Sequence, residues 1–268
     1  MMRFQKLKGK NIIKLHEKMA KEFIKKVKRK RNIVGIVCTG GIGRGYADKY
    51  SDIDITIFVK KNAKIGLPEE GEMDILVPKE DKIKYGIDKI KIDWGITDYE
   101  KVLKEKWDME TRWAFSQVKI LYDPEGKIRK LIKKKVVLPD KERKWLMMEG
   151  VEQSHYYGIR VPEIWICRGD VVSAHQCMYY GLEMLFQALF ALNKQLIPPP
   201  RWKLWYSRFL KWRPQDFERK IKRALSIKEF SKEELEKRKR AIIDLWEQIK
   251  PKVEKEVGMK WEEFKKII

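Results

Sequence analysis

The stretch GGIGRGYADKYSDIDITIFV, residues 40–59, joins two glycines to two aspartates that open an apolar run. The run is rich in β-branched residues, which indicates a buried strand over residues 53–59. Residues two apart on a strand point to the same side, so Asp52 and Asp54 project together, away from the isoleucines. Two adjacent carboxylates repel each other unless a cation lies between them. We therefore expect the pair to hold a divalent ion, and carboxylate oxygens suit Mg²⁺ or Mn²⁺.

The two glycines supply a complementary feature. Gly40 and Gly41 end the run NIVGIVCTG, a short predicted strand, and allow the backbone to approach a ligand closely. A helix that starts near Ile42 would offer free N–H groups to a phosphate, with Arg44 in its first turn as a charged clamp. A phosphate cradle beside metal-binding aspartates indicates a nucleoside triphosphate bound with Mg²⁺.

The spacing of these features resembles that of a known superfamily. A glycine pair, ten residues and then Asp-x-Asp at a strand start is similar to the signature of polymerase-β-type nucleotidyltransferases. The resemblance implies a mixed sheet with flanking helices, a third carboxylate from a later strand, and Mg²⁺-dependent transfer of a nucleoside monophosphate from a triphosphate, ATP being the expected one. It also implies nucleotide contacts from Gly40, Gly41, Arg44 and Ser51.

Three aspartates are candidates for the third carboxylate. Asp93 lies in KIKIDWGIT, a convincing strand, on the side opposite to the isoleucines. Asp74 follows a loop-like segment and Asp88 precedes the strand, so we favour Asp93 and keep Asp74 as the alternative. The expected catalytic and metal-binding set is Asp52, Asp54 and Asp93.

Strand signals almost vanish after VVLPD, residues 136–140. We therefore expect an α+β chain, with a nucleotidyltransferase domain over residues 1–138 and a helical bundle domain over residues 139–268. In the first part we expect a helix with an apolar stripe from Ile12 to Val27, strands, and helical spacing from Tyr99 to about Lys135. The remaining expected segments are strands at 32–40, 53–59, 73–77 and 88–97, a loop at 66–72, a turn at 123–126, and helices at 141–157, 170–196 and 231–257, the last kinked or divided by Pro251.

The second half also resembles a known domain. The segment from Arg168 to Trp205 is similar to the helical C-terminal domain of small nucleotidyltransferases that modify aminoglycosides and lincosamides. By that resemblance Lys203 reaches the triphosphate, and the acceptor is a small molecule with a hydroxyl group. Glu183, an acidic residue in an apolar helix, is either a general base for that hydroxyl or an ion-pair partner between helices.

Two other functions compete for the same sequence. Arg168 and His175 have the loose spacing of HEPN-type ribonucleases, whose helical domains accompany minimal nucleotidyltransferases in toxin–antitoxin systems. The chain could also be a catalytically silent RNA-binding module, although the intact aspartate pair argues against that. Neither alternative has a signal as specific as the segment around Asp52.

The charge of the chain raises RNA as a second kind of acceptor. The formal net charge is +22, and residues 1–31 hold thirteen Lys or Arg against Glu17 and Glu22. This segment is either a polyanion-binding surface or the solvated face of a helix in a Lys-rich, heat-adapted protein. We find no membrane span and no secretory signal, and three cysteines form no metal-type pair, so we expect a cytoplasmic protein.

Overall fold

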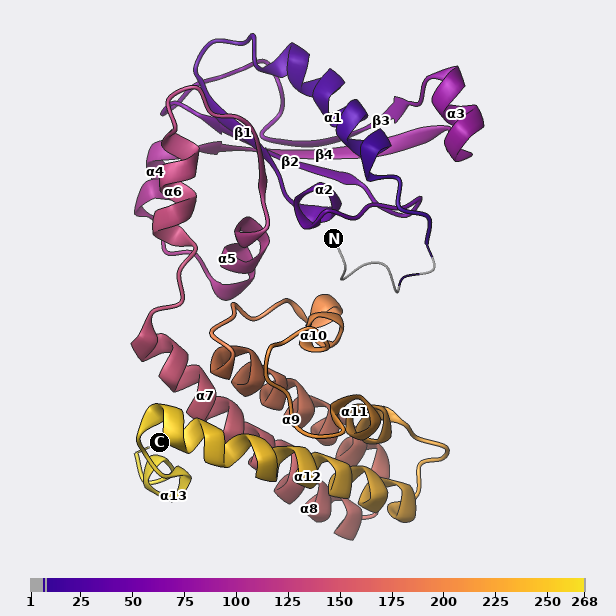
Figure 1. The fold of residues 1–268 in the computed structure, drawn as a ribbon, viewed down its shortest axis with the longest axis vertical. Helices are drawn as coiled ribbons and strands as arrows, with labels where there is room; N and C mark the ends of the chain where they lie inside the picture. The colour runs from indigo at the N-terminus through magenta and orange to yellow at the C-terminus, as the bar shows by residue number, and fades with distance from the viewer. Residues whose placement is uncertain (1–6, 8, 268) are drawn as a thin grey trace. The chain divides into compact units, whose positions relative to one another are not determined.

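The computed structural model describes residue 7 and residues 9–267, and it divides the chain into two compact units. The first unit ends at Val137 and the second begins at Leu138. The strands of the described residues all lie in the first unit, and the second unit is helical (Figure 1). The expected α+β class, with a mixed sheet followed by helices, is confirmed.

The first unit is built on a five-stranded sheet in the order β3-β4-β2-β1-β5. Its central pair, β2 and β4, runs parallel, and the other neighbours run antiparallel. The strands are β1 (Ile33–Cys38), β2 (Ile53–Val59), β3 (Glu70–Leu76), β4 (Lys89–Asp98) and β5 (Lys119–Tyr122).

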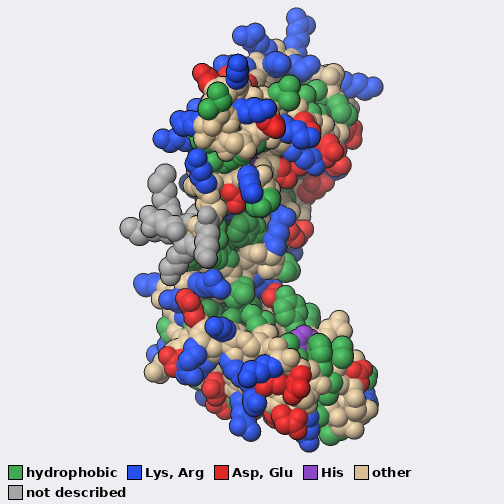
Figure 2. Space-filling model, turned by 90° about the vertical axis from the view of Figure 1, so that its right-hand side faces the viewer, with side chains coloured by type: hydrophobic (Ala, Val, Ile, Leu, Met, Phe, Trp, Pro, Cys, Tyr) green, Lys and Arg blue, Asp and Glu red, His purple; other side chains and the backbone are tan. Residues whose placement is uncertain are grey.

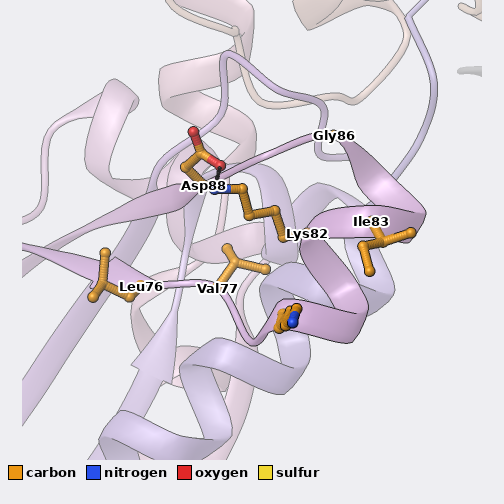
Figure 3. Close-up of a pocket in the computed structure, with 7 residues that line it drawn as sticks. Leu76, Val77, Lys82, Ile83, Gly86 and Asp88 are labelled. Atoms are coloured by element: carbon orange, nitrogen blue, oxygen red, sulfur yellow. Dashed lines mark ion pairs between the residues drawn. The ribbon is translucent and has the colours of Figure 1, made fainter.

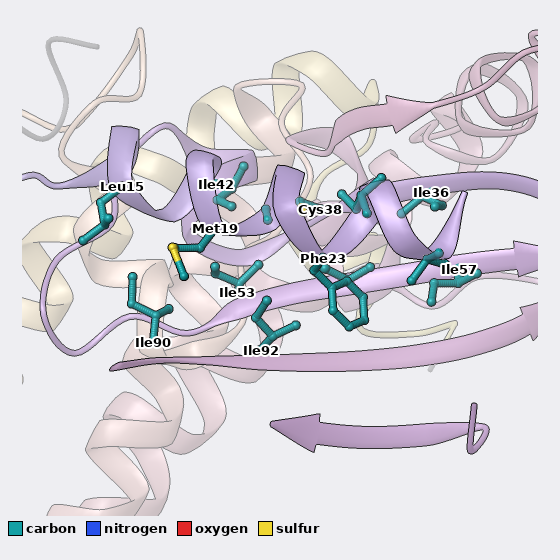
Figure 4. Packing of buried hydrophobic residues seen from close by; sticks show 14 of the residues in the cluster. Leu15, Met19, Phe23, Ile36, Cys38, Ile42, Ile53, Ile57, Ile90 and Ile92 are labelled. Carbon is teal, nitrogen blue, oxygen red and sulfur yellow. The ribbon is translucent and has the colours of Figure 1, made fainter. Parts of the chain in front are cut away.

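Helices cover both faces of this sheet, which explains why β1 and β2 read as nearly continuous apolar runs. Helix α1 (Ile13–Val27) lays its apolar stripe on one face, where Leu15, Met19 and Phe23 lie beside the isoleucines of β2 and β4 (Figure 4). The other face carries a second apolar cluster, which includes Phe58 of β2. That cluster is covered by α4 (Tyr99–Lys104), α5 (Met109–Ser116) and α6 (Lys127–Lys135).

Two segments of the first unit differ from expectation. Lys119–Tyr122 lies in the region predicted to be helical, but it forms β5 and pairs with the free edge of β1. Four residues are too few to show a period, so the tertiary pairing decides the conformation. Strand β3 begins at Glu70, inside the predicted loop, and is followed by a short helix, α3 (Lys79–Tyr85).

The predicted helices of the second unit are confirmed with shifted ends. Helix α9 stops at Leu192, four residues early, and α12 passes through Pro251 as one element. The predicted helix at 141–157 extends beyond its expected end through a π-helical segment, η2. The elements are α7 (Asp140–His155), η2 (Tyr156–Arg160), α8 (Val161–Cys167), α9 (Val171–Leu192), α10 (Pro200–Ser207), α11 (Phe217–Leu225), α12 (Lys232–Val257) and α13 (Trp261–Phe264).

Glycines allow α9 to pack closely against this extended helix. A Cβ atom on Gly181 would lie 2.3 Å from the backbone nitrogen of Gly158 in η2. A Cβ atom on Gly150 of α7 would lie 2.7 Å from the carbonyl oxygen of Met184. The core of the second unit thus depends on backbone-to-backbone contact at two points along α9. None of the described helices is both long and apolar enough to cross a membrane.

Candidate active site

The parallel register of β2 and β4 places two of the predicted carboxylates side by side. Asp54 is the direct partner of Asp93, and Asp52 stands one residue before β2. One carboxylate oxygen from each of the three aspartates lies within 4.8 Å of those of the others. Ile53 and Ile55 are buried under α1, so alternation directs Asp54 to the opposite face of the sheet.

Gly40 makes room for one of these carboxylates. Its φ is +51°, and a Cβ atom there would lie 1.6 Å from Oδ2 of Asp54. A Cβ atom on Gly41 would lie 2.8 Å from the carbonyl oxygen of Tyr46. The glycine pair is therefore required by close approach within the chain itself, a reason that the sequence pattern did not indicate.

The short helix after this glycine begins earlier than expected. Helix α2 (Gly40–Arg44) starts at Gly40 and not near Ile42, with Thr39 as its N-cap residue. Arg44 consequently lies in the last turn of α2, so its predicted place in the first turn was wrong. The helix ends at Arg44, and Gly45 follows as its C-cap residue with a φ of +84°, a left-handed conformation that stops the helix.

A lysine from β4 lies beside the third aspartate. Lys91 Nζ is 3.2 Å from Oδ1 of Asp93 and 2.5 Å from Oε2 of Glu72, the register partner of Asp93 on β3. The Glu72 carboxylate, followed by that of Asp93, raises the pKa of Lys91 above its ordinary value. Lys91 therefore stays charged and offsets part of the repulsion between these carboxylates.

The three aspartates fit a hard divalent cation. They offer only oxygen donors, which is the ligand set that Mg²⁺ and Mn²⁺ prefer. Oδ1 of Asp93 is buried and makes no hydrogen bond, because Lys91 approaches it as an ion pair without hydrogen-bond geometry. A buried carboxylate oxygen without a hydrogen bond is a costly feature that coordination of a cation would relieve.

A hollow of about 580 Å³ includes Asp54 and Asp93 in its lining. Two acidic residues of β3, Glu70 and Glu72, line it as well, together with Thr39, Thr56, Gly71 and Gly95 among others. The sequence did not indicate the two glutamates, because they fall within the predicted loop. The alternating acids of EEGEMDI were the available signal for a strand with a charged side.

Ser51 and its loop are held by the start of α1. The Ser51 hydroxyl accepts a hydrogen bond from the backbone N–H of Asp48 at 3.1 Å and lies 3.3 Å from the carboxylate of the same residue. Its carbonyl oxygen is 2.9 Å from Nε2 of His16, which is fully buried. Earlier in the same loop, the carbonyl oxygen of Ala47 accepts a hydrogen bond from the backbone N–H of Ile12 at 2.7 Å. The N-terminal turn of α1 thus fixes the segment that leads into Asp52.

The rival aspartates are engaged elsewhere. Asp74 forms an ion pair with Lys89 at 2.5 Å, and Asp88 forms one with Lys82 at 2.6 Å. The second pair belongs to a hollow of about 760 Å³ between the end of β3 and α3 (Figure 3). Aliphatic side chains such as Ile83 line this hollow beside Lys79 and the Lys82–Asp88 pair. None of the three aspartates lines it, so we assign it no catalytic role.

The predicted site residues of the second unit form their own contacts. Lys203 and Glu183 form an ion pair at 2.7 Å, with 12% and 15% of their side chains exposed. This is the interhelical pairing that stood as the alternative to a general base. The Arg168 guanidinium lies over the Trp165 ring, whereas His175 contacts Arg238, and no described contact joins Arg168 to His175.

Comparison with known proteins identifies the first unit. Residues 20–138 match the family model of the nucleotidyltransferase domain. These residues form a nucleotidyltransferase domain. It is the domain of a class of transferases that move phosphorus-containing groups. The match starts within α1, so the nucleotidyltransferase domain as matched contains the three aspartates but not His16.

Other comparisons add little to this. No curated protein matches the sequence. The chain is similar to a solved nucleotidyltransferase-like protein from Exiguobacterium sibiricum 255-15, at 11% identity and a TM-score of 0.46. That similarity covers 92% of this chain and 78% of the other.

Proposed function

We propose that the protein transfers a nucleoside monophosphate from a nucleoside triphosphate, ATP in the first instance, to a hydroxyl group, with release of pyrophosphate. The observation that carries this proposal is the register that sets Asp54 beside Asp93, with Asp52 in reach of both. The family of residues 20–138 supports the same class of reaction. We take residues 1–138 as the catalytic domain and residues 139–268 as the helical domain.

The three aspartates would hold Mg²⁺, or Mn²⁺ in its place. When bound, the ion neutralises charge on the triphosphate and orients its reacting phosphate. The acceptor oxygen forms a bond to the α-phosphorus, the bond from that phosphorus to the bridging oxygen breaks, and pyrophosphate leaves. Asp93 is the proposed acceptor of the hydroxyl proton.

Other residues have proposed roles in holding the nucleotide. We assign nucleotide contacts to Gly40, Gly41, Arg44 and Ser51 in the first unit. Lys203 of the helical domain is a further proposed contact, and its pairing with Glu183 means that binding of a phosphate there would have to replace or share a carboxylate partner.

Two classes of acceptor have support. Glu70 and Glu72 line the hollow beside Asp54, and their charge favours a small acceptor that is neutral or cationic. The net charge of +22 favours RNA. We expect the reaction to take place in the cytoplasm, and the Lys- and Glu-rich composition suits a thermophilic source.

The proposal is tested by following the α-phosphate. The protein is incubated with each α-³²P-labelled triphosphate, Mg²⁺ and separate RNA and small-molecule fractions of cell extract. Label should move to one fraction and should require Mg²⁺ or Mn²⁺. If no triphosphate labels either fraction, the proposed reaction is wrong.

Four variants locate the chemistry within the site. Asp52→Asn and Asp54→Asn should abolish transfer while the protein melts at the parent temperature or slightly above it, since a repulsion is relieved. Asp93→Ala should lower turnover by orders of magnitude, and Asp74→Ala should leave it unchanged. A reversed result for the last two would transfer the third-carboxylate role to Asp74.

A further inference from the structure

One end of the first unit collects cations from two distant segments. The sequence contains no acidic residue between Glu22 and Asp48, and none between Asp54 and Glu69. The fold brings the basic parts of these segments together, because β1 begins where β2 ends, with Ile33 paired to Val59. The backbone N–H of Lys60 also donates to the carbonyl oxygen of Asn32 at 2.9 Å.

We call this surface the cationic end. Its members are exposed, and none forms an ion pair with a carboxylate among the described residues; Lys25 is left out because it pairs with Glu22. Figure 2 shows several Lys and Arg side chains projecting at the top of the view. The cationic end consists of Lys26, Lys28, Arg29, Lys30, Arg31, Lys60, Lys61 and Lys64.

Helix capping explains only part of this arrangement. Cations at the C-terminus of α1 interact favourably with the helix dipole, which accounts for Lys26 and Lys28. It does not account for the three lysines of residues 60–64, which belong to the loop after β2. Eight unpaired cations held together repel one another, so the local charge exceeds what the fold itself requires.

The surroundings of the cationic end favour a phosphate backbone as its partner. In the described part of residues 23–47 and 55–68, no large apolar side chain is strongly exposed. A membrane-binding surface would add such side chains to its cations, whereas a surface for a nucleic-acid backbone needs charge alone. Six residue steps, at roughly 3.3 Å each, separate Asp54 from Lys60, so the cationic end lies about 20 Å from Asp54.

We propose that the cationic end binds the sugar–phosphate backbone of RNA. The long Lys and Arg side chains neutralise successive phosphates without reading bases, so binding is independent of sequence and decreases with salt. This binding requires neither Mg²⁺ nor a nucleotide, and it therefore stands apart from the transfer reaction proposed above.

The test is a salt titration with a fluorescein-labelled single-stranded RNA of 20 nucleotides, followed by fluorescence anisotropy. In the test variant, Lys28, Arg29, Lys30 and Arg31 are all replaced by Gln. Single-stranded RNA gives a slope of about 0.7 per neutralised phosphate in log K against log salt, so four lost contacts reduce the slope by about 2.8. We expect affinity at low salt to fall by at least roughly tenfold.

A matched variant distinguishes the effect of where the cations lie from the effect of the protein's net charge. Arg129, Lys130, Lys133 and Lys134 of α6 are also exposed, and no ion pair with a carboxylate is found for them in the described residues. Their replacement by Gln removes the same four charges from the same unit. We expect this variant to keep at least half of the parent affinity and nearly the same slope.

Three results would overturn the proposal. They are equal loss in both variants, absence of RNA binding by the parent, and binding by the parent to phosphatidylserine vesicles in place of RNA. If the first variant does not fold, Lys60, Lys61 and Lys64 are replaced instead, with an expected reduction of the slope by about 2.1. Asp54→Asn should bind RNA like the parent, so that failure of transfer and failure of RNA binding are measured separately.

Discussion

Gly40 is the residue whose missing side chain leaves room for the carboxylate of Asp54. Oδ2 of Asp54 occupies the space that a Cβ atom at residue 40 would fill. The positive φ of Gly40 is a second reason why this position requires glycine. The carboxylate pair and the glycine are thus one structural requirement, although the ten residues between Gly41 and Asp52 belong to the rest of α2 and a loop.

Gly40→Ala should therefore damage the site more than the fold. The new Cβ atom displaces the Asp54 carboxylate, so we expect the rise in melting temperature on adding Mg²⁺ to be largely lost. The control is Gly86→Ala, where φ is +69° and nothing lies within 4 Å of the new atom. That variant suffers only backbone strain of about 1 kcal/mol and should keep its full response to Mg²⁺. Equal responses in the two variants would contradict the role given to Gly40.

Lys91 offers a second prediction at this scale. Its charge offsets those of Glu72 and Asp93, and a bound cation must compete with it for Asp93. Lys91→Met should lower the melting temperature of the metal-free protein and tighten Mn²⁺ binding by roughly several-fold, because a nearby positive charge is gone. Binding is measured by Mn²⁺ titration followed by electron paramagnetic resonance.

The neighbouring lysine provides the control for this prediction. Lys89 forms a similar cross-strand ion pair with Asp74 at 2.5 Å. No described ion pair joins Lys89 to Asp52, Asp54 or Asp93. Lys89→Met should leave Mn²⁺ affinity unchanged. If both variants bind Mn²⁺ like the parent, Lys91 is an ordinary surface ion pair.

The residues of the site differ in how far the sequence could predict them. Asp52 and Asp54 follow from strand alternation, which is a local property, whereas Asp93 was sought because the family resemblance implies a third carboxylate from a later strand. The structure brings the three carboxylates together. The proximity of Glu72 depends on the pairing of β3 with β4, and pairing partners leave no local pattern. The same holds for His16, whose contact with Ser51 spans thirty-five residues.

At the scale of the elements, α1 has a role beyond its basic face. Its first turn supports the loop that leads into β2, and His16 is the buried side chain in that contact. A histidine four residues after Ile12, within the apolar stripe, was the available signal, because a buried polar side chain normally has a partner.

His16→Phe tests this support. Phe fills the space but leaves the Ser51 carbonyl oxygen without its partner, so we expect a loss of about 1–3 kcal/mol in the free energy of unfolding. Because Ser51 precedes Asp52, Mg²⁺ binding should weaken as well. Met19→Leu, a volume-conserving change on the same buried face, should lower stability slightly and leave Mg²⁺ binding intact. Normal Mg²⁺ binding in the His16 variant would limit the histidine to packing.

The elements that were mispredicted are those defined by their neighbours. Strand β5 is four residues long and exists because β1 has an edge to pair with. Helix α9 ends at Leu192, where Asn193 donates to the carbonyl oxygen of Leu189 and binds the backbone of Trp212. The helix was predicted to reach residue 196 because its apolar spacing continues to that point. That spacing gives no sign of a cap formed by a residue distant in the sequence.

At the scale of the whole molecule, the order of an α/β half followed by a helical half was readable, because the loss of strand signals after residue 140 is a property of composition. The matched domain supplies the class of reaction. Surfaces assembled from separate segments, such as the β3 glutamates and the cationic end, could be recognised only from the fold.

The cysteines give a prediction about the two units. Burial raises the pKa of the Cys38 thiol to about 12, so at pH 8 the thiol remains protonated and shielded in the first unit. Cys167 is exposed in the second unit, and burial raises the pKa of Cys177. Under native conditions iodoacetamide should label Cys167 first and Cys38 last, as followed by mass spectrometry of peptides.

The same labelling experiment can be repeated at increasing concentrations of urea. Labelling of Cys38 should rise only over the range of urea in which the first unit unfolds, while Cys177 reports on the second. Rapid labelling of Cys38 in the native protein at pH 8 would contradict its burial.

The π-helical segment Tyr156–Arg160 sets the rotational phase of everything that follows it in the same helix. Each residue of an α-helix advances the chain by about 100° around the axis, and a π-helical turn holds an additional residue. Deleting one residue from this segment would restore regular α-helical geometry, and α8 would keep nearly the same orientation relative to α7, because the turn loses only the residue that it holds in excess. The segment is therefore the place in this helix where the loss of one residue changes the phase of α8 least.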